Sequence, residues 1–192
     1  MSDPARAPRS LVARGMLLIA RGRAEGLNCF RDTPQAFLAS LAPGMGILAA
    51  AVLAGLSEGD AGRAAGEIPG TLCVLLAPSV LSFELARLWG RDAFWYRYIV
   101  AFNWCQWLLP VVGFALVLAL TVARVAGGGG GGGIFKIVIL GLAGYALWMN
   151  WFLARHGLAL SRLRAAIFVV AVNLGTMALI FVPAMLATLT RS

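Results

Sequence analysis

The sequence contains few charged residues. Asp, Glu, Lys and Arg make up only 12% of its 192 residues, about half the share of an average soluble domain. Apolar residues account for 60%, and the mean hydropathy is +0.84. These values exclude an ordinary soluble domain and predict an all-α polytopic membrane protein. The excess of basic over acidic residues, 16 against 8, then indicates contact with anionic lipid head groups.

Residues that ligate metals or act as nucleophiles are also scarce. There is one histidine, His156, and the three cysteines are scattered without a metal-binding spacing. Ser79 or Ser82 with His156 is the one conceivable serine–histidine pair, and no nucleophile motif surrounds either serine. The seven glycines at 127–133 lack the Gly-Lys-Ser/Thr ending of a phosphate-binding loop and are expected to form a flexible linker. We therefore predict no cofactor, no metal site and no enzymatic activity.

Five apolar segments are each long enough to cross a bilayer as a helix, at about 1.5 Å per residue across a core of about 30 Å. They cover residues 34–56, 68–89, 98–122, 134–154 and 165–189. Loops are then expected at 57–67, 124–133 and 155–164. The sequence thus divides into an N-terminal region, 1–33, and a five-helix membrane domain, 34–192. In the first segment, Gly46, Ala50 and Ala54 recur every four residues and predict a small-residue face for close helix contact.

The N-terminal region is predicted to carry a surface helix. Residues 1–9 are polar and expected to be disordered. Over 10–30, Arg14 and Arg21 share one helical stripe, while Ile19 and Leu27 fall on the opposite side with other apolar residues. This pattern favours an interfacial amphipathic helix lying on the bilayer. The alternative is a helix packed on a partner protein.

The distribution of basic residues predicts the orientation. Twelve of the sixteen fall in the N-terminal region and in the loops after the second and fourth segments, and the other four fall on the opposite side. The positive-inside rule then places the N-terminus in the cytoplasm and the C-terminus outside. Basic residues that are almost all Arg, with abundant Ala and Gly, suggest a bacterial source, and hence the inner membrane and a periplasmic C-terminus. All six tryptophans fall near the predicted inner ends, as an aromatic belt would: Trp89, Trp95, Trp104, Trp107, Trp148 and Trp151.

Polar side chains within the apolar segments form the one candidate site. All lie toward the predicted cytoplasmic side: Glu84, Arg87, Asn103, Gln106, Asn150 and Asn173. Arg87 is three residues from Glu84, so a structural ion pair is preferred over a proton or substrate site. For the amides, a hydrogen-bonded layer that fixes helix packing is preferred over a polar cavity open to the cytoplasm.

Three short segments accompany the five predicted spans and the cytoplasmic N-terminal segment: RDTPQAF at 31–37, FWYRY at 94–98 and HGLALSRLRAA at 156–166. Together these features resemble the architecture of the Yip family, small membrane proteins named for interaction with Rab GTPases in eukaryotes. The resemblance implies a five-span fold with a cytoplasmic N-terminal segment. The Asp-Leu-Tyr-Gly-type motif of eukaryotic members is absent, so no functional residue carries over. We expect a structural or interaction protein that contacts lipid and other membrane proteins or a second copy, without nucleic acid. The alternative is a small transporter or channel subunit using Glu84, Asn103, Gln106 and Asn173.

Overall fold

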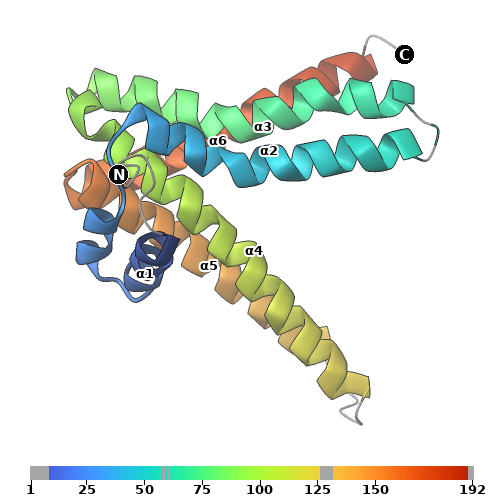
Figure 1. Cartoon of the computed structure of the whole chain (residues 1–192), viewed down its shortest axis with the longest axis horizontal. Helices are drawn as coiled ribbons and strands as arrows, with labels where there is room; N and C mark the ends of the chain where they lie inside the picture. The colour runs from blue at the N-terminus through green and yellow to red at the C-terminus, as the bar shows by residue number, and fades with distance from the viewer. Residues whose placement is uncertain (1–8, 58, 60, 126–131, 190–192) are drawn as a thin grey trace, which may run out of the picture.

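The computed structural model describes residues 9–57, 59, 61–125 and 132–189. Over these residues the chain is helical and has no strand, as predicted (Figure 1). Five of its helices are long and apolar enough to cross a membrane. The elements in order are α1 (Arg9–Ala20), η1 (Ala24–Cys29), α2 (Pro34–Ser57), α3 (Ala61–Leu88), η2 (Asp92–Phe94), α4 (Trp95–Val125), α5 (Gly132–Gly157) and α6 (Arg162–Leu189).

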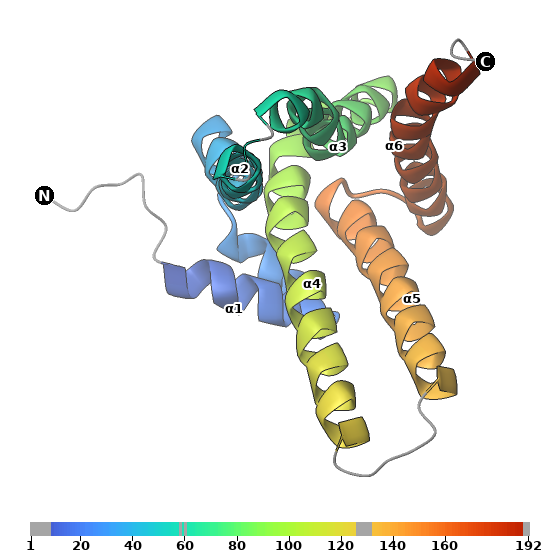
Figure 2. The same ribbon diagram turned by 90° about the vertical axis from the view of Figure 1, so that its right-hand side faces the viewer.

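The long helices form two arms that diverge from one end of the molecule. Figures 1 and 2 show α2, α3 and α6 extending in one direction and α4 and α5 in another. We call the end where α1, η1, η2 and the α5–α6 turn gather the proximal end. Helices α2 and α4 end, and helices α3 and α5 begin, at the far, distal ends of the arms. Successive long helices therefore run in alternating directions between the two ends.

The long helices extend beyond the predicted apolar segments. Residues 61–67, expected in a loop, form the first turns of α3. The predicted loop 124–133 is shortened at both sides by α4 and α5, and its middle, 126–131, lies outside the described residues. Most of the predicted turn 155–164 is helical as well, which leaves four residues between α5 and α6. Hydropathy marks the part of a helix that suits lipid, and polar residues continue the same backbone hydrogen bonding past that part.

The prediction of one helix over residues 10–30 is wrong. Residue 22 is a glycine with a φ of +72°, and this left-handed residue ends α1. The Gly22 N–H donates to the carbonyl of Ile19, and the Arg23 N–H donates to that of Leu18, which closes the helix in a Schellman motif. The chain then turns into η1. The disorder predicted for residues 1–8 falls outside the described part, and Arg9 already belongs to α1.

The apolar side of this N-terminal segment faces the protein itself. Ile19 and Leu27 are 0% and 1% exposed and belong to the main hydrophobic cluster. Two hydrogen bonds fasten the segment to the long helices: the Tyr145 hydroxyl of α5 donates to the Ala20 carbonyl (2.7 Å), and Arg97 of α4 donates to Asn28 (3.3 Å). The residues expected to face the bilayer thus pack on α4 and α5.

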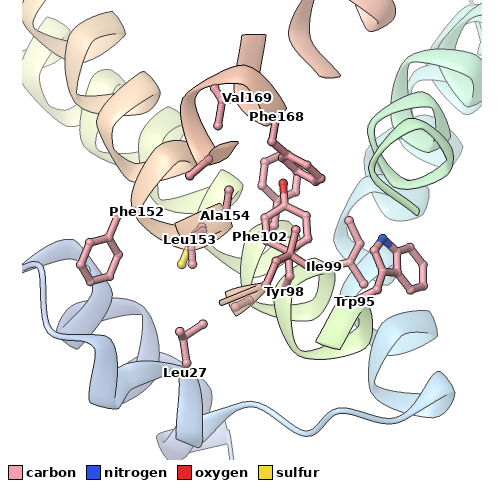
Figure 3. Packing of buried hydrophobic residues seen from close by; sticks show 14 of the residues in the cluster. Leu27, Trp95, Tyr98, Ile99, Phe102, Phe152, Leu153, Ala154, Phe168 and Val169 are labelled. Carbon is pink, nitrogen blue, oxygen red and sulfur yellow. The ribbon is translucent and has the colours of Figure 1, made fainter. Parts of the chain in front are cut away.

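Most of the packed core lies at the proximal end, around Tyr98 of α4 (Figure 3). The Tyr98 ring lies 5.4 Å from that of Phe168 in α6, edge to face, and 5.6 Å from that of Phe102. Gly157 at the end of α5 makes this approach possible, because a Cβ there would lie 3.1 Å from the Cβ of Tyr98. Three long helices therefore meet at one aromatic residue.

The small-residue face predicted in α2 is not the one that packs. Gly46 is exposed and a Cβ there would meet nothing within 4 Å. The buried stripe of α2 is instead formed by Ser40, Gly44 and Leu48. A Cβ at Gly44 would lie 2.6 Å from Cδ1 of Leu75 in α3, so this glycine permits the close α2–α3 contact. The two stripes have the same four-residue period, and period alone does not distinguish them.

Candidate functional site

A cavity of about 300 Å³ lies between α2, α3 and α4. Its polar side chains include Ser40 of α2 and Asn103 and Gln106 of α4. Leu75 and Val74 of α3 contribute to its apolar wall. None of the described residues that line it is charged. The volume is at the lower end of the range for small-molecule sites, about 300–1,000 Å³.

A short hydrogen-bond chain crosses from α4 to α2 beside this cavity. The Asn103 amide N–H₂ donates to the Ser40 hydroxyl at 2.9 Å, and that hydroxyl donates to the Phe37 carbonyl at 2.7 Å. Ser40 is 1% exposed. This is the helix-to-helix amide bond that the layer hypothesis predicts, although its partner is a serine. Sequence reasoning missed Ser40, whose one signal is its place in the stripe with Gly44 and Leu48.

Gln106 lies one turn farther along α4 than Asn103. It is half-buried, lines the same cavity and makes no hydrogen bond with any described residue. Asn103 and Gln106 are three residues apart, which puts them on one face of α4, and they line the same cavity. Of the two, only Asn103 has a hydrogen-bond partner among the described residues.

Glu84 and Arg87 lie elsewhere, on the outer surface of α3. Their closest charged atoms are 3.8 Å apart, and their side chains are 58% and 67% exposed. Neither residue lines the cavity. The spacing of three residues predicts this ion pair, and the structure shows that both of its side chains are exposed.

Asn150 and Asn173 lie on different helices, and neither lines the cavity. Asn150 of α5 is 8% exposed, and its Oδ1 has no hydrogen-bond partner among the described residues. Asn173 of α6 is exposed and donates to the Val169 carbonyl of its own helix at 2.8 Å. Of the six candidate residues, the structure thus places two around one cavity and distributes the other four over α3, α5 and α6.

The serines and tryptophans show a second connection that the sequence did not reveal. The Trp95 indole N–H donates to the Ser82 hydroxyl at 3.0 Å, and that hydroxyl donates to the Ser79 carbonyl. Trp95 is 7% exposed and belongs to the core rather than to an aromatic belt at the surface. His156 packs on the Phe152 ring at 4.5 Å and makes no hydrogen bond with either serine.

Within the described part of the chain, no three His, Cys, Asp or Glu residues gather as a metal site would require. Comparison with models of protein families, with curated proteins and with solved structures gives no match. The geometry of the chain is therefore the basis for a functional proposal.

Proposed function

We propose that the chain is an integral protein of the bacterial inner membrane that acts as a structural or interaction component and not as an enzyme. The observation that carries this proposal is the uneven packing of five apolar helices. Within the most apolar stretch of each helix, only 11% of residues are buried in α2 and only 6% in α4. A protein in water would not leave such long apolar surfaces uncovered. Lipid or another membrane protein would cover them.

The charge distribution supports a cytoplasmic proximal end. Eleven described arginines lie in α1, beside η1, or at the ends of the long helices that meet there: Arg9, Arg14, Arg21, Arg23, Arg31, Arg87, Arg91, Arg97, Arg155, Arg162 and Arg164. At the distal ends, the first two turns of α3, the first two turns of α5 and the last turn of α4 each carry one basic residue. Under the positive-inside rule this asymmetry supports a cytoplasmic N-terminal segment. The same arginines would contact anionic head groups.

The interaction role is supported by the N-terminal segment and the shape of the arms. The segment holds α4 and α5 together through the Ala20 and Asn28 hydrogen bonds. Its outer side still exposes Leu11 and Leu17, at 39% and 50%. The five apolar helices are also among the features on which the resemblance to the Yip family rests. We therefore favour a scaffold that contacts membrane proteins and lipid.

The transporter or channel alternative rests on the cavity. Asn103 and Gln106 line it, whereas Glu84 and Asn173 do not. A path using all four residues would require α3 and α6 to turn these side chains inward. Only two of the four residues of the transport hypothesis, Asn103 and Gln106, therefore line the cavity.

Affinity purification of the tagged full-length protein in a mild detergent tests the interaction role. We expect the protein to purify with a stoichiometric partner or as a defined oligomer. Alkaline carbonate washing of membranes tests insertion separately, and we expect the protein to stay in the membrane fraction. Extraction by carbonate would contradict membrane insertion. A lone monomer from several mild detergents would contradict the interaction role and leave insertion intact.

A further inference from the structure

Gln106, whose amide pairs with none of the described residues, lies far from the ends of its helix. It lies eleven residues after Trp95, where α4 begins, which is roughly 16 Å at about 1.5 Å per residue. In a bilayer that position is within the hydrocarbon core, where no water pairs with an amide. An amide without a partner in such surroundings is costly. A ligand that both donates and accepts a hydrogen bond would therefore pair with its carbonyl oxygen and its N–H₂ group.

The residues that line the cavity beside Gln106 indicate the charge and polarity of the rest of the ligand. It has no charged lining residue among those described, so it offers no counter-ion to a phosphate or an ammonium group. Its polar side chains are Ser40 of α2, Asn103 and Gln106 of α4 and Thr71 of α3, and the apolar Ile47, Val74 and Leu75 line it as well. A molecule with an uncharged polar head at Gln106 and an apolar chain along Val74 and Leu75 matches this lining.

We propose that this cavity binds an uncharged lipid of the diacylglycerol type, with its free hydroxyl and an ester carbonyl at Gln106. The hydroxyl donates to Oε1 of Gln106, and the ester carbonyl accepts from Nε2. One acyl chain lies along Val74 and Leu75 of α3, and the remainder stays in the bilayer. A lipid with a carbonyl alone, such as a quinone, leaves Oε1 unpaired. The inference rests on the proposed membrane insertion.

Photocrosslinking of the full-length protein in neutral phosphatidylcholine vesicles tests the site, with a photoreactive diacylglycerol as the probe. We expect crosslinks in the segments 40–47, 71–78 and 102–107, displaced by excess diacylglycerol. Gln106→Leu loses the hydrogen bonds and should lower crosslinking about tenfold. Asn173→Leu is the matched control, because this amide lies outside the cavity and bonds its own helix. It should leave crosslinking unchanged.

A second pair of variants keeps every amide. Val74 is 45% exposed and lines the cavity, so Val74→Trp should fill the space and abolish crosslinking without disturbing the core. Val80→Trp, on the same helix at an exposed position outside the cavity, should have no effect. Equal crosslinking in both members of either pair would overturn the proposal, as would equal displacement by phosphatidylglycerol or a quinone. Vesicle flotation separates the two proposals: a protein that does not float with vesicles contradicts insertion itself, whereas a floating protein without these crosslinks contradicts only the lipid site.

Discussion

The proximal end and the distal arms both contain large apolar residues, yet they differ in what surrounds those residues. Phe168 and Phe181 lie on the same helix, α6, and are 0% and 60% exposed. The proximal end has aromatic contacts and hydrogen bonds between helices far apart in sequence. The difference teaches that the chain itself specifies packing at one end, whereas the surroundings of the arms come from the bilayer or a partner.

The largest effect should come from truncating the two phenylalanines of α6. Phe168→Ala removes a ring packed against Tyr98 and Trp89, and we expect a loss of about 3–5 kcal/mol in unfolding free energy. Phe181→Ala should cost far less, because its ring is mostly exposed. Unfolding in mixed micelles by titration with sodium dodecyl sulfate, followed by circular dichroism, measures both. Similar losses for the two variants would remove the distinction between the ends.

A pair of glycines on α5 tests close packing at the same end. Gly157→Ala places a Cβ 3.1 Å from that of Tyr98, and we expect a loss of about 1–3 kcal/mol from overpacking. Gly144→Ala meets nothing within 4 Å and should be neutral or stabilise the helix by up to about 1 kcal/mol. The same titration compares them, and a neutral Gly157→Ala would show that α4 and α5 lie farther apart.

A smaller effect is expected from the indole hydrogen bond. Trp95→Phe keeps an aromatic ring and removes the donor to Ser82, for a loss of about 0.5–1.5 kcal/mol. Trp148→Phe is the control, because its ring is 38% exposed and its indole makes no hydrogen bond within the described residues. Thermal unfolding in detergent should give a lower Tm for Trp95→Phe than for Trp148→Phe, and the reverse order would contradict the assigned core position.

The smallest effect is expected at the predicted ion pair. Glu84→Gln removes a charge that is exposed and 3.8 Å from Arg87, so we expect no measurable change in Tm. A transporter that uses Glu84 predicts instead that this variant abolishes a flux while leaving expression intact. Measuring both properties on the same preparation decides between the exposed pair and a transport residue.

The sequence predicted the positions of the helices well, and it predicted poorly which face of each helix packs against the others. Hydropathy and length identify each apolar helix, because both are properties of a segment. Which face packs depends on partners distant in sequence, as the α2 stripe shows: Ser40 meets Asn103, 63 residues away, and Gly46 meets nothing. The amides of the candidate site differ for the same reason. The sequence shows that Gln106 and Asn173 both lie within apolar segments. Only the fold shows that Gln106 lines a cavity and that Asn173 does not.

The break after α1 had a local signal that a reading by periodicity overlooks. Arg21-Gly22-Arg23 places a glycine where a Schellman motif requires a left-handed residue, and the apolar period continues on both sides. The inward orientation of Ile19 and Leu27 had no such signal. An amphipathic segment packs on lipid or on protein with the same pattern of residues.

Labelling from the two sides of the membrane tests the central claim most directly. In a background without Cys29, Cys73 and Cys105, Ser161→Cys marks the exposed α5–α6 turn at the proximal end, and Ser57→Cys marks the exposed distal end of α2. A membrane-impermeant maleimide should label Ser57→Cys in intact spheroplasts, and Ser161→Cys only after permeabilisation. Labelling of both positions from the same side, or the opposite order, would contradict a cytoplasmic packed end with arms that cross the bilayer.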